Sequence, residues 1–186
     1  MYMTPQNVST EMATDVLVDF IREHCRKETM KELAKAARFR TSFFAPAKKV
    51  RLFEEVFFLH AALALASVDQ TTSDRPTKVY LRTLFQYKVR QKIGALIGQD
   101  DPSFGTRQSA HMKSYSSILV NGGDEIGLVS TFLQHLHLSS DRSLDLQASM
   151  ELLPHLLAAR NLINQVAASM IVQPNSEDDD GESSDF

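Results

Sequence analysis

The feature of this sequence that most constrains its fold is the apolar run from Val56 to Ala66, which His60 interrupts. The run is about half as long as the roughly 20 residues that a membrane-spanning helix needs. The segment that contains it begins at Ala45-Pro46, where a proline is tolerated at a helix start, and past Val56 it is apolar on nearly every face. We therefore predict that residues 46–68 form the buried central helix of a bundle.

The composition fits a single all-α domain. Apolar residues make up 43% and charged residues 23% of the 186 residues, and only seven Gly and six Pro are available to break regular structure. A chain of this length buries a sizeable core without disulfides or a metal to hold it together. We expect a multi-helix bundle of about six to seven helices over residues 9–172. A flexible lead over residues 1–8 should precede it, and a disordered acidic tail over residues 173–186 should follow it.

Local start and stop signals divide the bundle into helices. Ser9 or Thr10 can cap a first helix that runs toward Glu28, and Thr29-Met30-Lys31-Glu32 fits a capping box. Either a second helix restarts there and continues to about Phe39, or one long bent helix covers both segments. No run shows strand-like alternation. The later helices are expected over residues 76–97, 106–120, 124–138 and 139–172, with Pro154 either kinking the last helix or starting another.

The charged residues are sorted by position along the chain. Met1 to Ile21 carries a net charge of −3, Arg22 to Lys113 one of +9, and Ser114 to Phe186 one of −9, so the overall charge of −3 hides a basic middle between acidic ends. This pattern indicates a polyanionic partner, and nucleic acid is the partner that we expect.

The basic middle contains two sets of cations at helical spacing. Lys27, Lys31, Lys35 and Arg38 are four, four and three residues apart, which places them along one edge of a helix. A bundle can hold this edge beside a second cationic helix, and backbone phosphates are the natural ligands of both. The candidate nucleic-acid-binding residues are Lys27, Lys31, Lys35, Arg38, Arg40, Lys48, Lys49, Arg51, Lys78, Arg82, Lys88, Arg90 and Lys92.

Solvated ion pairs are the alternative explanation of the first set. Glu23 and Lys27, Glu28 and Lys31, and Glu32 and Lys35 all stand at helical pair spacing. Such pairs contribute only about 0.2 to 0.5 kcal/mol each and explain a charged surface without any ligand. The excess of charge is harder to explain in this way, because Arg22 to Arg51 contains ten cations and three anions.

Aromatic residues lie among the cations. Tyr80, Tyr87 and Phe43 are candidates for stacking on unpaired bases, whereas Phe85 belongs to the apolar stripe of its helix and is expected in the core. No recognition helix, finger or sheet-based signature is present. Any binding should therefore be mainly to the phosphate backbone and weakly sequence-specific.

The sequence offers little for catalysis, metal binding or cofactor binding. The lone Cys25 cannot form an internal disulfide and favours a reducing compartment, for which we expect the cytoplasm. His135 and His137 are two residues apart and point in different directions on a helix, and no second pair has a zinc spacing. His60 is expected to be a satisfied core residue. We predict no catalytic, cofactor or metal site and no enzymatic activity.

The segment from Ser176 to Phe186 holds six acidic residues and one apolar residue, so it cannot bury enough surface to fold. It either keeps the protein soluble or acts as a tethered polyanion that competes with weak nucleic-acid binding.

Two segments resemble a known class of proteins. Ala47-Lys48-Lys49-Val50-Arg51 leading into Phe53 to Ala66, and Tyr80 to Gly98 with its basic edge, resemble the small subunits of multi-subunit CRISPR effector complexes. Those subunits are helical bundles that line the path of bound nucleic acid. The resemblance covers about Ser9 to Val172 in architecture, carries over no functional residue, and implies several copies or a large partner protein beside an RNA or DNA backbone.

The leading hypothesis is thus a non-enzymatic helical subunit that contacts the backbone of RNA or single-stranded DNA, as in an RNA-guided ribonucleoprotein complex. The alternative is a helical adaptor or inhibitor that binds a protein through an apolar groove or its acidic segments, without nucleic-acid contact. Under either hypothesis we expect no membrane partner. Cations gathered on one surface favour the first hypothesis, and dispersed cations beside an open apolar groove favour the second.

Overall fold

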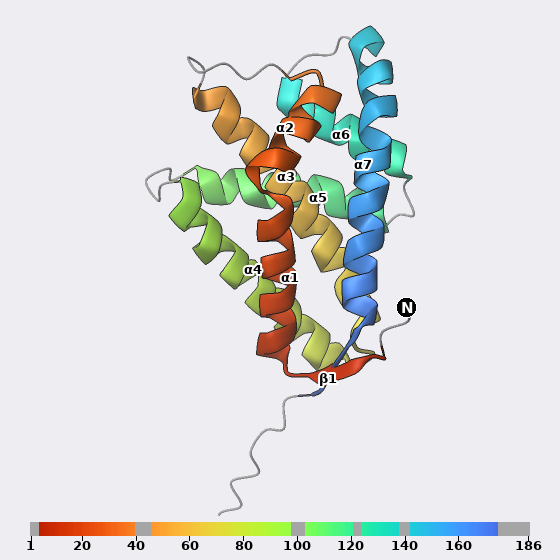
Figure 1. Cartoon of the computed structure of the whole chain (residues 1–186). Coiled ribbons are helices and arrows are strands. Elements are labelled where there is room, and N and C mark those ends of the chain that lie inside the picture. The colour runs from red at the N-terminus through yellow and green to blue at the C-terminus, as the bar shows by residue number, and fades with distance from the viewer. Residues whose placement is uncertain (1–3, 40–45, 98–102, 121–123, 138–141, 175–186) are drawn as a thin grey trace, which may run out of the picture.

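The computed structural model confirms the all-helical fold (Figure 1). It describes residues 4–39, 46–97, 103–120, 124–137 and 142–174, with the backbone alone described for residues 93–97 and 142–145. The described helices and strands are β1 (Gln6–Val8), α1 (Thr10–His24), α2 (Lys27–Ala36), α3 (Pro46–Ser67), the 3₁₀ turn η1 (Val68–Gln70), α4 (Arg75–Ile97), α5 (Phe104–Val120), α6 (Glu125–His137), α7 (Arg142–Ala168) and β2 (Met170–Val172).

Side-chain caps set the starts of several helices. The Ser9 hydroxyl accepts a hydrogen bond from the backbone N–H of Met12 at 3.2 Å, which confirms Ser9 as the cap of α1. Asp74 accepts one from the N–H of Thr77 at 2.8 Å at the start of α4, and the hydrogen bonds from Thr77 lower the pKa of Asp74. Because α1 ends at His24 and α2 begins at Lys27, the chain forms two helices here and not one long bent helix.

The helix α2 ends in a Schellman turn built on a residue other than glycine. Arg38 has a φ of 53°, in the left-handed region that favours glycine. The Arg38 N–H donates to the carbonyl of Lys35 at 3.0 Å, and the Phe39 N–H donates to the carbonyl of Ala34 at 2.8 Å. The buried ring of Phe39 anchors the turn in the core and offsets the backbone strain at Arg38.

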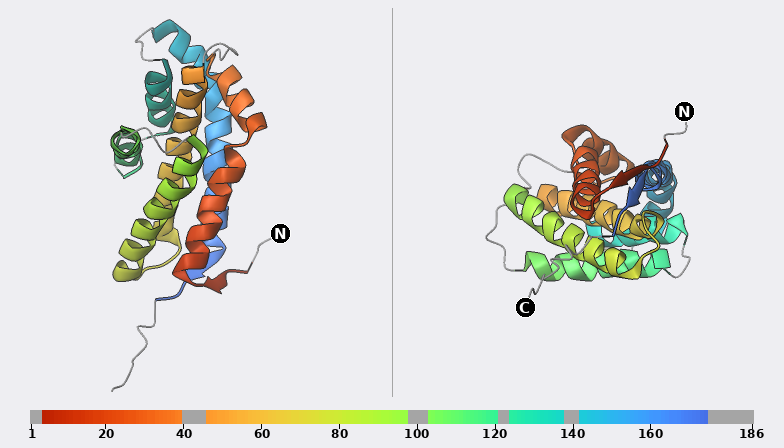
Figure 2. Two further views of the ribbon diagram at one scale, coloured as in Figure 1. Left: turned by 90° about the vertical axis from the view of Figure 1, so that its left-hand side faces the viewer. Right: turned by 90° about the horizontal axis from the view of Figure 1, so that it is seen from below.

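The helix α3 is the centre of the bundle, as its apolar sequence predicts. Every residue from Glu54 to Ala64 is buried, and α3 contacts each of the six other described α-helices. Helices α1 and α7 run alongside it, α4 packs on α1, and α5 crosses α3 (Figure 1). The side view shows that the bundle is elongated along α1, α4 and α7 (Figure 2).

Strands β1 and β2 pair in parallel at one end of the bundle, with Gln6 opposite Met170 and Val8 opposite Val172 (Figure 2). This pairing corrects two expectations: residues 6–8 are not part of a loose lead, and the last helix ends at Ala168, before Val172. Strands of three residues are too short to show a period-two pattern. The acidic tail lies, from residue 175 onward, outside the described residues.

The helix α7 continues through Pro154, so the proline does not start a new helix. Its ring is exposed, at a position where water can reach the carbonyl group that lacks its usual N–H donor. Within the described part of the chain, none of the helices combines the length and the apolar character that crossing a bilayer requires.

Candidate functional site

Four of the five predicted cations of α4 lie beside carboxylates from other elements; Arg90 is the exception among the described residues. Lys88 Nζ is 2.9 Å from Asp15 Oδ1 of α1, and Lys92 Nζ lies 3.6 Å from Asp19 Oδ1. At the other end of α4, the side chains of Lys78 and Arg82 converge on Asp69, at 3.5 and 3.0 Å. These four side chains therefore join α4 to α1 and to η1, and their charges are largely neutralised within the protein.

The cations of α2 have a different environment. Lys27, Lys31 and Lys35 are exposed and have no carboxylate within 4 Å among the described residues. The fourth member of the row, Arg38, faces Glu151 of α7 at 3.5 Å. The lysines form the row along one helix edge that their spacing predicts, but Glu28 and Glu32 lie exposed beside them and leave α2 with a net charge of only +1.

The predicted cations near the start of α3 lie partly beside the end of α2. Lys48 and Lys49 are exposed, Arg51 is half-buried, and the Lys48 ammonium lies 6.0 Å from the centre of the Phe39 ring, just past the end of α2. Arg40 lies outside the described residues. The structure does not bring the α2 and α4 sets into direct contact, because α2 packs on α3 and α7 whereas α4 packs chiefly on α1.

A groove of about 470 Å³ lies between α4 and α5. Arg90 of α4 and Lys113 of α5 line it; both are exposed, and neither has a carboxylate within 4 Å among the described residues. No acidic side chain of the described residues lines the groove; the lining residues are Leu65, Thr83, Gln86, Tyr87, Arg90, Gln108, Ser109, Met112, Lys113 and Ser116. The groove thus combines a concave surface with uncompensated positive charge.

Of the aromatic side chains predicted to stack on bases, only Tyr87 lies in this groove among the described residues. Tyr87 lies in the α4–α5 groove, is 58% exposed, and its hydroxyl accepts a hydrogen bond from Gln91 Nε2 at 2.6 Å. Tyr80 is 43% exposed and donates to Glu11 Oε1 at 3.3 Å, away from the groove lining. Phe85 is fully buried, as predicted, and Phe43 lies outside the described residues.

The structure also assembles a polar cluster inside the bundle that is not predicted from the sequence. The carboxylate of Glu55, on α3, accepts hydrogen bonds from Nδ1 of His111 and from the Tyr115 hydroxyl at 2.9 Å, both on α5. His135 of α6 donates to the same carboxylate at 3.1 Å. The rings of His111 and His135 stack with their centres 4.0 Å apart. Three helices therefore converge on one buried carboxylate.

The electrostatics of this cluster are dominated by Glu55, whose side chain is 2% exposed. Burial by itself raises the pKa of Glu55, but the hydrogen bonds and charges of His111 and His135 outweigh burial, so that the pKa is lowered. Burial and then the neighbouring Glu55 raise the pKa of Tyr115 well above its usual range. The carboxylate is therefore the charged member and the phenol a neutral donor.

The adjacent Glu54 is also buried and is paired with Arg107 of α5, whose Nη2 lies 2.7 Å from Glu54 Oε1. Arg107, His111 and Tyr115 follow one another at four-residue intervals and form one row on the face of α5 that meets α3. The sequence signal for this cluster was the pair Glu54 and Glu55 directly before the mainly apolar half of α3, because carboxylates in a buried helix need partners. The partners could not be identified from the sequence, because His111 and His135 lie 56 and 80 residues after Glu55.

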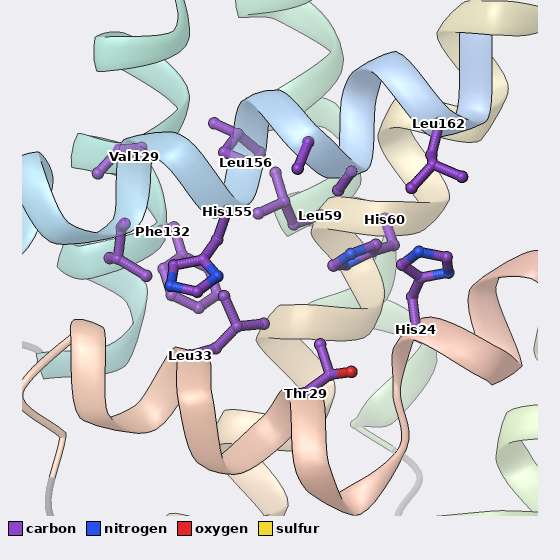
Figure 3. Close-up of a pocket in the computed structure, with 13 residues that line it drawn as sticks. His24, Thr29, Leu33, Leu59, His60, Val129, Phe132, His155, Leu156 and Leu162 are labelled. Atoms are coloured by element: carbon purple, nitrogen blue, oxygen red, sulfur yellow. The ribbon is translucent and has the colours of Figure 1, made fainter. Parts of the chain in front are cut away.

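A second cavity, of about 170 Å³, lies between α1, α2, α3, α6 and α7 (Figure 3). Its walls are mainly apolar, and three imidazole rings line it, those of His24, His60 and His155. His60 is buried and its Nδ1 donates to the carbonyl of Val56 at 2.6 Å, which confirms it as a satisfied core residue. Burial, with the nearby His24 as a smaller cause, lowers the pKa of His60 to about 4.

The remaining polar candidates have structural partners. Burial raises the pKa of Cys25 to about 12, which is unlike the lowered pKa of a reactive thiol. His24 Nδ1 donates to the Phe20 carbonyl at 2.9 Å. His137 Nε2 donates to the carbonyl of Ala37 at 2.8 Å, on a different face of α6 from His135, as the two-residue spacing predicts.

Comparison of this chain with protein-family models, with curated proteins and with solved structures gave no match in any of the three. The candidate sites therefore stand on their own geometry and chemistry.

Proposed function

We propose that the protein is a non-enzymatic nucleic-acid-binding subunit that holds the backbone of RNA or single-stranded DNA in the α4–α5 groove. Four of the predicted α4 cations are paired with carboxylates and the α2 lysines lie apart from α4, so the proposal is carried by one pair alone. This pair is Arg90 and Lys113, exposed on opposite sides of a groove that no described acidic side chain lines; Lys113 was not among the residues predicted from the sequence. A concave surface of one charge sign concentrates polyanions, and phosphate oxygens are good partners for guanidinium and ammonium groups.

Tyr87 adds a second element of recognition. Its exposed ring lies in the same groove, and base stacking on an aromatic side chain is worth about 1–3 kcal/mol per base while tolerating any sequence. The hydrogen bond from Gln91 restrains the Tyr87 hydroxyl and so restricts the ring. Proteins that bind single strands without sequence preference usually combine cations that contact phosphates with an aromatic side chain on which a base stacks.

The α2 lysine row is a weaker contributor in this proposal. Its three exposed lysines are flanked by Glu28 and Glu32, so its field is partly cancelled along the same helix. The α4 cations Lys78, Arg82, Lys88 and Lys92 contribute least, because each already lies within 4 Å of a carboxylate. As a small subunit of an assembly like the CRISPR effector complexes, the chain would hold a segment of the bound strand in this groove.

A pair of matched double variants tests the proposal. Arg90→Glu with Lys113→Glu changes the groove, and Lys31→Glu with Lys35→Glu makes the same change of charge on α2. Binding to a short RNA, a single-stranded DNA and a duplex DNA is measured by fluorescence anisotropy over a range of salt concentrations. Each neutralised phosphate contributes about −0.7 to the slope of log affinity against log salt for a single strand.

We expect the groove variant to lose about tenfold or more in affinity for single strands at low salt and to reduce the steepness of the slope by about 1.4. The α2 variant should lose clearly less. A larger loss in the α2 variant than in the groove variant would move the site to α2 and refute the groove. A wild-type chain that binds none of the three oligonucleotides at low salt would exclude the function altogether and favour the adaptor alternative.

A further inference from the structure

The Glu55 cluster has the composition of a transition-metal site. Two imidazole nitrogens and one carboxylate oxygen form a donor set that Zn²⁺ and neighbouring divalent metals use in proteins. The ligand atoms that Glu55, His111 and His135 offer all lie within 4.8 Å of one another. They come from three different helices, so the fold and not a local sequence motif assembles the set.

We propose that Glu55, His111 and His135 bind one divalent first-row transition-metal ion. An ion held tetrahedrally by bonds of about 2.0–2.1 Å separates its ligand atoms by about 3.3 Å. His135 Nδ1 and the Glu55 carboxylate oxygen are already 3.1 Å apart. On binding, each Nδ1 gives up the proton that it now donates to Glu55, and the stacked imidazoles rotate so that their nitrogen lone pairs and the carboxylate oxygen face a common centre.

Burial and charge favour an ion at this position. The Glu55 side chain is 2% exposed, and its negative charge, which the hydrogen bonds of His111, His135 and Tyr115 compensate here, would equally be compensated by a bound cation. The side chains of His111 and His135 are 25% and 20% exposed, which provides a route of entry from solvent. Three protein ligands also leave at least one coordination position for water or another small molecule.

Tyr115 is a positioning residue in this proposal. Its hydroxyl donates to Glu55 Oε2 at 2.9 Å from a fully buried ring, and therefore orients the carboxylate without itself ligating. Outer-shell partners of this kind are typically worth about 10–100-fold in metal affinity. Phe58 packs edge-on against His111 and restricts its ring, with the two ring centres 5.7 Å apart, and Phe58 is itself in contact with Phe104.

Metal titration of the full chain, purified without a histidine tag and treated with a chelator, tests the proposal. Zn²⁺ binding is followed by calorimetry and Co²⁺ binding by visible absorption, which reports the coordination of the metal directly. We expect one ion per chain, d–d absorption bands with Co²⁺, and a Zn²⁺-dependent rise in the melting temperature. A wild-type chain that binds neither ion would overturn the proposal by itself.

The variants Glu55→Gln and His135→Gln each remove one ligand and should lower the affinity by more than about 100-fold, beyond an outer-shell effect. Tyr115→Phe should lower it by about 10–100-fold while keeping the Co²⁺ bands. The matched control is His155→Gln, which removes an imidazole from the other cavity and should leave the affinity unchanged.

If Glu55→Gln does not fold, as circular dichroism would show, His111→Gln replaces it in the comparison because its side chain reaches the surface. Binding that survives in the cluster variants but is lost in His155→Gln would place the metal in the other cavity and refute the assignment. This experiment uses no nucleic acid, so its result is independent of the proposed groove.

Discussion

Lys88 of α4 lies 2.9 Å from the carboxylate of Asp15 on α1, and Lys92 lies 3.8 Å from the same carboxylate oxygen. The acidic edge of the first helix therefore faces the basic edge of the fourth, and the two helices hold each other partly by charge. The same contact that joins α1 to α4 removes these lysines from the surface charge available to a polyanion. Folding therefore partly cancels the positive charge of the middle of the sequence with negative charge from the first helix.

The contribution of this helix contact to stability should be small and sensitive to salt. The Asp15 side chain is half exposed, so its ion pairs are screened by water, and Asp15→Asn should lower the free energy of unfolding by less than about 1 kcal/mol. Urea denaturation at low and at high salt measures the effect, which should shrink as salt rises. A loss of several kcal/mol that salt does not change would mean that Asp15 has a packing role instead.

Arg38→Gly should stabilise the protein, which is unusual for a change to glycine. The φ of 53° at Arg38 strains any residue with a Cβ atom, and glycine relieves that strain. The Arg38 to Glu151 pair that is lost is exposed and 3.5 Å long, so it offsets little. We expect a gain of about 0.5–1 kcal/mol in the free energy of unfolding. Arg38→Ala serves as the control, because it loses the same ion pair, keeps the strain, and should give no gain.

His60 should make the protein less stable in mild acid. Because burial lowers its pKa to about 4, the unfolded chain binds more protons than the folded chain between about pH 6.5 and pH 4. The stability that neutral His60 contributes is complete above this window and is lost as the pH falls through it, with a total of about 3 kcal/mol. His60→Gln, measured by urea denaturation from pH 7 to pH 4, should flatten this part of the pH dependence.

A second acidic transition belongs to Glu55 and lies at lower pH. The pKa of Glu55 is lowered in the folded protein, so its contribution is present above the usual carboxyl value and is lost as the pH falls through the lower folded value. His60 and Glu55 are thus distinguished by the pH range in which each changes the stability.

The His60→Gln variant also provides the test for His60. If its free energy of unfolding falls with pH above pH 5 as steeply as that of the wild type, a group other than His60 titrates in this range.

Tyr115→Phe should lower the free energy of unfolding by about 1.5–3 kcal/mol, the value of a buried hydrogen bond to a charged group. The reason is that the fully buried Glu55 carboxylate loses the donor that lies 2.9 Å from Oε2. Tyr87→Phe is the matched control, since its ring is exposed and the change should stay within about 0.5 kcal/mol. Equal effects of the two changes would show that the hydrogen bond from the Tyr115 hydroxyl adds little to stability.

The sequence predicted most of the helical architecture because helix signals are local. The apolar run from Val56 to Ala66 predicted the buried central helix, and Ser9 predicted the start of α1, since a cap acts on an N–H only three residues away. Periodicity likewise identified Phe85 as a core residue. The short strands β1 and β2 were not predicted, because three residues are too few to show the alternation of apolar and polar side chains that marks a strand. Only their pairing, between the two ends of the described chain, defines them.

The sequence by itself determined that the chain folds into helices around an apolar central one, and that the middle of the chain is rich in cations. Only the tertiary structure decided which of those cations remain uncompensated, because Asp15 and Lys88 meet across two helices and not along one. It likewise decided that Glu55, His111 and His135 share one site, since they stand on three helices at separations of 56 and 80 residues from the carboxylate. Helix formation depends on neighbours within one turn, whereas charge pairing and ligand geometry depend on how the finished helices pack.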